Sequence, residues 1–161
     1  MVHGLWSIHN FVNMEIRIIE YGSAEYEAMI KLRVTALLEP IGVPASYIDR
    51  KKEKDDFFIG AFDGDEMIGC CILTRKDEEV LQLRQMAVRP HLQGKKIGAE
   101  IIRFAEFVAK QNHFNILMMH ARDPVIGFYE KCGYRIVGEQ FFEVGIGHHK
   151  MQKELTPHQV S

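Results

Sequence analysis

The stretch that decides the fold occupies residues 83–99 and reads Leu-Arg-Gln-Met-Ala-Val-Arg-Pro-His-Leu-Gln-Gly-Lys-Lys-Ile-Gly-Ala. Its apolar first part predicts a strand over residues 80–88, and Pro90 breaks that strand because proline lacks a backbone donor. A long helix is expected over residues 93–111, where apolar residues recur every three or four positions. The first amides of a helix have no partner within it and carry partial positive charge. The stretch therefore predicts an anion-binding site where this helix begins.

Three residues at the start of the expected helix support the anion site. Gly94 has no side chain to keep a phosphate away from the backbone, and Lys95 and Lys96 add positive charge. Lysines at a helix N-terminus oppose the helix dipole, so a bound anion helps to explain them. From these residues alone, a simple turn with solvated lysines stays open. A P-loop and a dinucleotide-binding glycine fingerprint are both absent from the sequence, which excludes those two nucleotide-binding classes.

The remaining sequence alternates between short strands and helices. Strands are expected at residues 15–20, 57–62, 67–74, 115–120 and 134–137, and one or two more between 141 and 153. The first helix is expected from Ser23, which caps it, to Leu38. Two more helices are expected, one within residues 45–56 and one over residues 124–131. The second and third strands are joined across Asp63-Gly64, which is typical of an antiparallel hairpin. This order predicts an α+β (mixed α/β) fold with a central, mostly antiparallel sheet and helices on both faces.

Length and charge restrict the class of protein. The 161 residues fit one domain, which we expect to span residues 14–155. Residues 1–13 are interpreted as an N-terminal extension outside the fold, and residues 156–161 as a tail. The formal net charge of −2 gives no general affinity for nucleic acid or an anionic membrane. The sequence has no apolar run of the roughly 18 residues that a membrane-spanning helix needs.

The cysteines indicate a reducing environment. Cys70 and Cys71 are adjacent and would point to opposite faces of a strand, and Cys132 is the third. Such a set suits neither a disulfide framework nor a zinc site. We therefore expect buried, reduced thiols in a cytoplasmic protein that holds no metal.

Residues 93–99, Gln-Gly-Lys-Lys-Ile-Gly-Ala, resemble the Gln/Arg-x-x-Gly-x-Gly/Ala motif with which GNAT acetyltransferases hold the pyrophosphate of coenzyme A. Lys96 stands where the motif has its first glycine. Residues 86–88, Met-Ala-Val, resemble the strand whose backbone pairs with the pantetheine arm and polarises the thioester carbonyl. The resemblance implies acetyl-CoA as co-substrate, bound by Met86, Ala87, Val88, Gln93, Gly94, Lys95, Lys96, Ile97, Gly98 and Ala99.

The resemblance continues in residues 120–134, which are similar to the family's last catalytic helix and its Phe-Tyr-x-Lys-x-Gly-Phe/Tyr ending. It implies that Tyr129 protonates the departing CoA thiolate, which a phenol with a pKa near 10 can do. Tyr129, Phe128 and Asp123 are also expected in the cofactor site, and Asp123 replaces the asparagine of many relatives. A tyrosine that merely packs in the core is the alternative.

Residues 141–148 look like the ending Phe-x-Glu-x-Gly-Ile-Pro-His of a small bacterial subgroup that includes ElaA-like proteins, with Gly147 in place of proline. The match implies that His148 takes the proton of the acceptor ammonium and that Glu143 orients His148 or binds a cationic substrate. A hydrogen-bonded strand histidine is an equally good interpretation of His148. His149 is expected to alternate to the other face and to be solvated. The two histidines have no third ligand at a useful spacing, so a metal site is not predicted.

Taken together, the resemblance implies an N-acetyltransferase in which an amine attacks the thioester directly. A non-catalytic module of the same fold that binds or senses acyl-CoA is the alternative, and a purely structural role is a third. Arg84 or Gln85 is expected to face the acceptor, while Glu39 is better explained as a surface charge at a helix end. The sequence leaves open which amine, small or peptidic, is the acceptor and whether the chain forms a homodimer.

Overall fold

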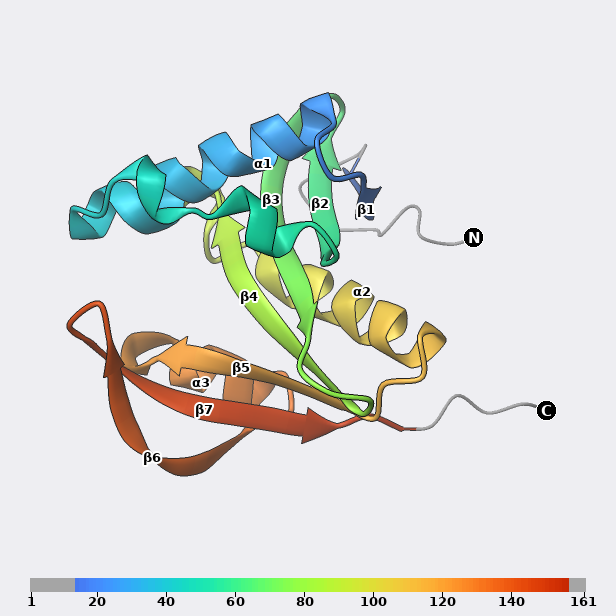
Figure 1. Ribbon diagram of the computed structural model, residues 1–161, viewed down its shortest axis with the longest axis vertical. Helices are drawn as coiled ribbons and strands as arrows, with labels where there is room; N and C mark the ends of the chain where they lie inside the picture. The colour runs from blue at the N-terminus through green and yellow to red at the C-terminus, as the bar shows by residue number, and fades with distance from the viewer. Residues whose placement is uncertain (1–13, 157–161) are drawn as a thin grey trace. The chain divides into compact units, whose positions relative to one another are not determined.

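The computed structural model describes residues 14–156, so the expected extension at residues 1–13 lies outside the described residues. Seven strands form one sheet in the order β1-β2-β3-β4-β5-β7-β6 (Figure 1). The pairs β1–β2, β2–β3, β5–β7 and β6–β7 are antiparallel, whereas β4 pairs with β5 in parallel. The predicted α+β fold with a mostly antiparallel sheet is confirmed.

Two compact units make up the chain. The first extends to Thr74 and includes Gln85–Ala105, and the second consists of Arg75–Arg84 and the chain from Glu106 onward. Strand β4 (Val80–Val88) and helix α2 (Ile97–Gln111) each contribute to both units.

The first unit is built on a hairpin, as the Asp-Gly pair predicts. Strand β2 (Phe57–Asp63) turns through Gly64 into β3 (Glu66–Arg75), and β1 (Met14–Ile19) pairs with β2 on its other side. Gly64 has a φ of 63°, which a glycine adopts without a steric penalty. Strands β2 and β3 carry buried side chains on both faces, whereas β1 buries Met14, Ile16 and Ile19 and leaves Ile18 exposed.

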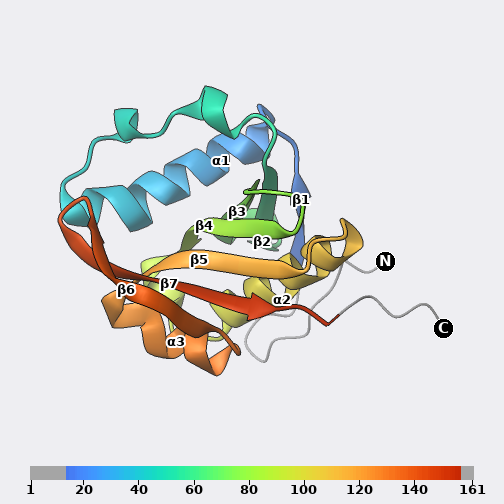
Figure 2. The same ribbon diagram turned by 60° about the horizontal axis from the view of Figure 1, so that its bottom comes forward.

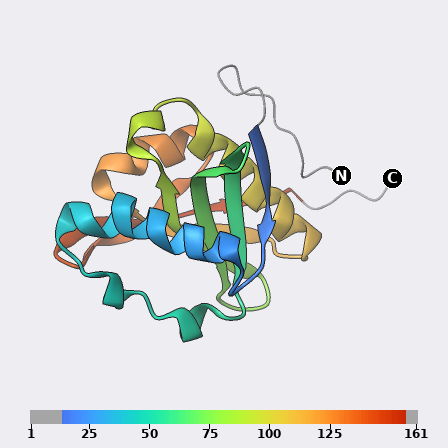
Figure 3. The ribbon, with the colours of Figure 1, turned by 90° about the horizontal axis from the view of Figure 1, so that it is seen from above.

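Helix α1 (Ala24–Arg33) covers one face of these strands (Figure 3). The Ser23 hydroxyl accepts a hydrogen bond from the Tyr26 amide at 3.1 Å, which confirms the predicted cap. The helix continues as a π-helix over Val34–Leu38 and a 3₁₀ turn over Glu39–Ile41. Its buried side chains form one core with the strands: Ile19, Tyr26, Met29, Ile30, Leu32, Phe58, Phe62, Met67, Cys70, Ile72 and Ala87.

The first part of α2 covers the opposite face. A Cβ atom built on Gly69 would lie 2.7 Å from Ile101 Cδ1, so glycine is needed where this helix crosses β3. Cys70 and Ile72 belong to the core under α1, and alternate strand residues point to opposite faces. Helices therefore cover both faces of the sheet in this unit, as predicted.

Two predicted helices differ from the structure. Helix α2 begins at Ile97 instead of residue 93, because Gly94 and Lys96 have φ values of 84° and 68° and cannot continue a right-handed helix. The expected helix within residues 45–56 is replaced by two 3₁₀ turns, Ala45–Tyr47 and Arg50–Glu53, with extended backbone at Ile48 and Asp49 between them.

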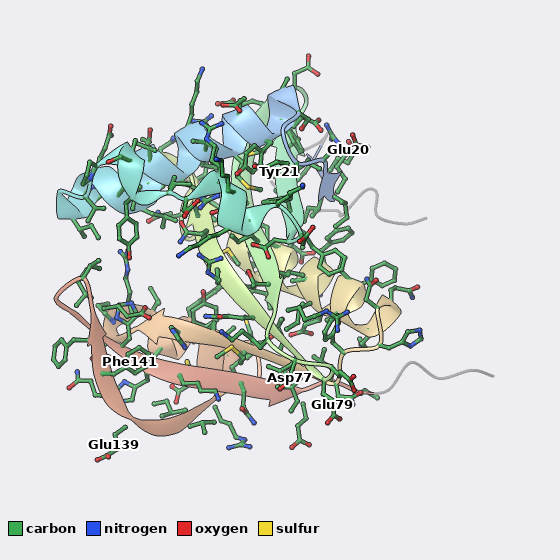
Figure 4. The ribbon with its side chains drawn as sticks, viewed as in Figure 1. Glu20, Tyr21, Asp77, Glu79, Glu139 and Phe141 are labelled. Carbon is green, nitrogen blue, oxygen red and sulfur yellow. The ribbon has the colours of Figure 1, made fainter. Side chains whose placement is uncertain are left out.

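The second unit begins with a tight turn in which the Asp77 carboxylate accepts hydrogen bonds from the amides of Glu79 and Val80, both at 2.8 Å (Figure 4). The other elements follow in chain order (Figure 2): β5 (Ile116–Arg122), a 3₁₀ turn (Asp123–Val125), α3 (Ile126–Lys131), β6 (Arg135–Glu143) and β7 (Ile146–Glu154). Strand β6 is longer than the predicted 134–137, because it continues past a register shift between Val137 and Phe141.

Candidate active site

The loop between β4 and α2 presents backbone to solvent, as an anion site requires. Gln93, Gly94, Lys95 and Lys96 are all exposed, and the Gln93 side chain closes the loop by donating to the Val88 carbonyl at 3.1 Å. A Cβ atom on Gly94 would meet nothing within 4 Å. The backbone at Gly94 is therefore accessible to a ligand from that side. The residues present therefore suit an anionic ligand such as the pyrophosphate of coenzyme A.

Lys96, which stands at the motif's first glycine, has a left-handed backbone conformation that glycine adopts readily. Its φ of 68° lies in the left-handed region, which non-glycine residues adopt only at a cost. Lysine at this position thus adds a long side chain and a positive charge to a turn whose backbone is left-handed.

The remaining motif residues are more deeply placed. Ile97 is 1% exposed and packs in the core, so only its backbone is available to a ligand. Gly98 and Ala99 are half-buried. On β4, the Ala87 side chain is buried, and Met86 and Val88 are half-buried.

In the second unit, Tyr129 lies on α3 and is 6% exposed. Its ring makes edge-to-face contacts with Phe128 and Tyr134, at centroid distances of 5.1 and 6.2 Å. The half-buried Phe128 therefore packs directly against the ring of Tyr129, the predicted proton donor.

Glu143 and His148 come together across the β6–β7 hairpin. Val144 and Gly145 have φ values of 45° and 74°, which form the tight turn between the strands. His148 Nδ1 lies 2.7 Å from the Ile146 carbonyl oxygen and must carry a proton to donate to it. Nε2 lies 3.7 Å from Glu143 Oε1. His148 is 5% exposed, so its imidazole is held in one orientation.

His120 is a third member of this cluster that the sequence did not single out. Its Nδ1 lies 3.0 Å from Glu143 Oε2, so Glu143 stands between two imidazoles. Phe141, near the end of β6 (Figure 4), packs against both rings, at 5.0 Å from His120 and 5.8 Å from His148. The apolar run of β5 gives no sign of this role, because only the pairing of β5 with β7 and of β7 with β6 brings His120 to Glu143.

Asp123 has partners that the sequence did not predict. His149 Nδ1 lies 2.7 Å from Asp123 Oδ1, and Gln140 Nε2 donates to Oδ2 at 2.5 Å. The hydrogen bonds from His149 and then Gln140 hold the pKa of Asp123 below its ordinary value. The expectation that His149 is merely solvated is wrong, because β7 turns its half-buried ring toward Asp123.

Gly147 explains how these partners fit. A Cβ atom at this position would lie 2.6 Å from Asp123 Oδ2 and 2.7 Å from Gln140 Nε2. The proline expected from the subgroup pattern has such an atom. Glycine therefore leaves the space in which Asp123 and Gln140 meet.

A buried ion pair in the first unit was also not foreseen. Arg33 and Glu53 are 1% and 3% exposed, and two hydrogen bonds of 2.9 and 2.6 Å join the guanidinium to the carboxylate. The Tyr26 hydroxyl donates to the same carboxylate at 2.9 Å, and burial together with this neighbour raises the pKa of Tyr26. The signal in the sequence was an arginine on the apolar face of α1, seven residues after Tyr26.

Arg33 also decides the orientation of Gln85. Its Nε atom donates to Gln85 Oε1 at 3.3 Å, so this side chain is held inside the first unit. Of the two residues expected to face the acceptor, Gln85 is thus engaged with α1. Glu39 is exposed at the end of the π-helix, in agreement with a surface charge.

All three cysteines lie in the described part of the chain and none forms a disulfide. Cys70 and Cys71 are buried as predicted, and burial raises the pKa of Cys70 to about 12. Cys132 is only partly buried. Among residues 14–156, no group of three or more His, Cys, Asp or Glu side chains could hold a metal ion. Within the same residues, no helix is both long and apolar enough to cross a membrane.

This arrangement of sheet, helices and strand-to-helix loop is that of the GNAT fold. The sequence profile of the Acetyltransferase (GNAT) family matches residues 26–134, and the chain belongs to this family. A relative in Bacillus subtilis, the uncharacterized N-acetyltransferase YitI, is 28% identical over 117 residues, which are 66% of this chain and 78% of YitI.

Solved structures share the fold. A Lactobacillus plantarum protein assigned to the N-acetyltransferases has a TM-score of 0.82 at 25% identity, covering 89% of this chain and 99% of that one. Escherichia coli ElaA has a TM-score of 0.76 at 21% identity over 88% of this chain and 99% of its own. A GNAT acetyltransferase of Elizabethkingia anophelis, solved with acetyl-CoA bound, has a TM-score of 0.68 at 23% identity over 89% and 99%. The predicted resemblance to GNAT and ElaA-like proteins is confirmed.

Proposed function

We propose that this protein is an acetyl-CoA-dependent N-acetyltransferase that transfers an acetyl group to a primary amine by direct attack on the thioester. The observation that carries the proposal is the exposed loop before α2, in which Gly94 leaves the backbone bare and Lys96 has a left-handed backbone. Membership of the GNAT family supports it.

The loop supplies the groups that would hold the phosphates. The backbone of residues 93–99 lies at the positive end of α2, and Lys95 and Lys96 extend into solvent beside it. The amides of residues 86–88 would pair with the pantetheine arm and polarise the thioester carbonyl as a backbone oxyanion site. Asp123 and Phe128, near the start of α3, would complete the contacts with the cofactor.

Tyr129 would donate a proton to the CoA thiolate as the carbon–sulfur bond breaks. Its aromatic contacts hold the phenol ring in position, as a general acid requires. His148 would accept the proton that the attacking amine loses, because Nδ1–H is committed to the Ile146 carbonyl and Nε2 is left as the acceptor. Glu143 would stabilise the imidazolium formed in this step.

Ligand-dependent unfolding tests the cofactor. Acetyl-CoA at a hundred times its dissociation constant should stabilise the protein by about 2.7 kcal/mol, which raises the midpoint by several degrees. Equal concentrations of CoA and ADP separate recognition of the whole cofactor from that of its nucleotide. If none of these ligands shifts the midpoint, the proposed function is wrong.

Replacement of the phenol tests catalysis. Tyr129→Phe should lower kcat by about a hundredfold, because it removes the proton donor, and should leave acetyl-CoA affinity unchanged. CoA release from a panel of small and peptide amines gives the rate, and Tyr47→Phe, at an exposed position, is the matched control. Wild-type protein that binds acetyl-CoA without transferring the acetyl group to any amine would instead support the non-catalytic acyl-CoA sensor.

A further inference from the structure

The ion pair of Arg33 and Glu53 is too costly to be explained by stability alone. Both side chains are almost completely buried, and removing two charges from water costs several kcal/mol per ion before their attraction offsets it. Well-packed apolar residues often serve a core equally well. We therefore look for a role of this pair that apolar residues could not perform.

Joining two elements of the first unit does not by itself require a buried pair. Arg33 ends α1 and Glu53 ends the 3₁₀ turn Arg50–Glu53. A second ion pair connects the same two elements, since Arg50 binds Glu27 at 2.5 Å with both side chains about half exposed. What distinguishes Arg33 is its third hydrogen bond, from Nε to Gln85.

Gln85 has an unusual backbone for a strand. It lies within β4 with a φ of 56°, a left-handed conformation that costs a non-glycine residue on the order of 1 kcal/mol or more. Its side chain is bound by Arg33, and its carbonyl oxygen lies 3.8 Å from the buried Cys70 thiol. Both ends of the residue are thus held by the core under α1.

The conformation of Gln85 sets the direction of the peptide groups after it. A reversal of the sign of φ within a strand bends the strand and redirects the following amides and carbonyls, as in a β-bulge. The residues that follow are Met86, Ala87 and Val88, whose amides the proposed function assigns to the thioester. An error of about 1 Å in such donors can reduce the rate about a hundredfold.

We propose that Arg33 is a positioning residue of the transfer reaction: paired with Glu53, it holds Gln85 in its left-handed conformation and so aims the backbone amides of residues 86–88. Glu53 is the counter-ion that neutralises the buried guanidinium and fixes its orientation through two hydrogen bonds. Gln85 transmits the constraint to the strand. This inference rests on the proposed function.

Substitutions at Gln85 test the proposal without removing a buried charge. Gln85→Ala deletes the acceptor of Arg33 Nε and should lower kcat at least tenfold. The dissociation constant of acetyl-CoA should change less than threefold, because the phosphate-binding loop at residues 93–99 is untouched. Gln85→Glu restores an acceptor and should return kcat to within about threefold of the wild-type value. Arg50→Ala breaks the exposed pair between the same elements and should change neither quantity.

A second measurement does not depend on knowing the acceptor. Acetyl-CoA added to ¹⁵N-labelled protein should shift the amide signals of residues 86–88, and Gln85→Ala should reduce these shifts while those of residues 94–98 persist. The inference is wrong if Gln85→Ala keeps the wild-type kcat and amide shifts, or if Gln85→Glu fails to rescue them. Wild-type protein that binds no acetyl-CoA overturns the proposed function and this inference with it.

Discussion

Each unit of the protein contains a network of charged side chains, and the two networks differ in their exposure to water. In the first unit, Arg33 and Glu53 are 1% and 4% exposed at their side chains. In the second, Asp123 and His149 form an equally short contact with side chains that are 32% and 23% exposed, and Glu143 is 46% exposed. Both contacts are short, but only the Arg33–Glu53 pair has both side chains shielded from solvent.

The difference in exposure determines how each network responds when one partner is removed. A buried charge that loses its partner stays buried and uncompensated, so the first network is rigid and its loss is severe. Exposed charges are solvated when a partner is removed, so the second network adds little to stability. Within this network Glu143 is 46% exposed and its partner His148 only 6%, so the pair proposed for proton transfer is itself partly shielded from solvent.

The largest effect is expected for Glu53→Ala. This change leaves the Arg33 guanidinium and the Tyr26 hydroxyl buried without their shared acceptor. It should lower the free energy of unfolding by about 3–5 kcal/mol, as for other broken buried pairs. Equilibrium urea unfolding measures the loss.

Two further variants separate burial from pairing. Arg50→Ala, in the exposed pair, should cost no more than about 1 kcal/mol. The double variant Arg33→Met with Glu53→Leu should recover much of the stability that Glu53→Ala loses, because no charge remains in the core. Equal losses for Glu53→Ala and Arg50→Ala would show that exposure does not distinguish the two pairs.

A smaller effect is expected in the second unit for Gly147→Ala. The new Cβ atom would approach Asp123 Oδ2 and Gln140 Nε2 within 3 Å, and the flexible Gln140 side chain is free to rotate away. The variant should lose about 1 kcal/mol, the net value of a typical hydrogen bond. Thermal unfolding measures this change.

Gln140→Ala is the matched control for this substitution. In the Gln140→Ala background, Gly147→Ala should cost less than in wild type, because the hydrogen bond that it displaces is already gone and only the approach to Asp123 Oδ2 remains. Additive losses in the double variant would mean that the contact with Asp123 itself decides the cost.

The fold could be predicted from the sequence wherever a local signal decides the structure. The Asp63-Gly64 turn, the Ser23 cap and the apolar periodicity of α2 each specify their element within a few residues. The start of α2 was misplaced because left-handed backbone at Lys96 gives no sign in a sequence. Lysine is a good helix former, so the pattern favoured a longer helix.

The candidate site was predictable only in part. The loop at residues 93–99 and Tyr129 each belong to a short motif that is continuous in the sequence, so a local pattern is enough to find them. Arg33–Gln85, His120–Glu143 and Asp123–His149 join residues 52, 23 and 26 positions apart. Such pairs depend on strand register and on how α1 packs, neither of which a local pattern reports.

The smallest effect, and the one that reports the exposed network most directly, is the pH dependence of Asp123→Asn. Hydrogen bonds from His149 and Gln140 lower the pKa of Asp123, so the ionised carboxylate stabilises the folded state above the unfolded pKa of about 3.9. This stability is lost as the pH falls through the lower folded value. Wild type should therefore lose more stability than Asp123→Asn between pH 7 and pH 3 in urea unfolding. Glu139→Gln, on a side chain that points away from β6 (Figure 4), should follow wild type. If Asp123→Asn has the wild-type acid sensitivity, the contact with His149 does not hold the carboxylate ionised.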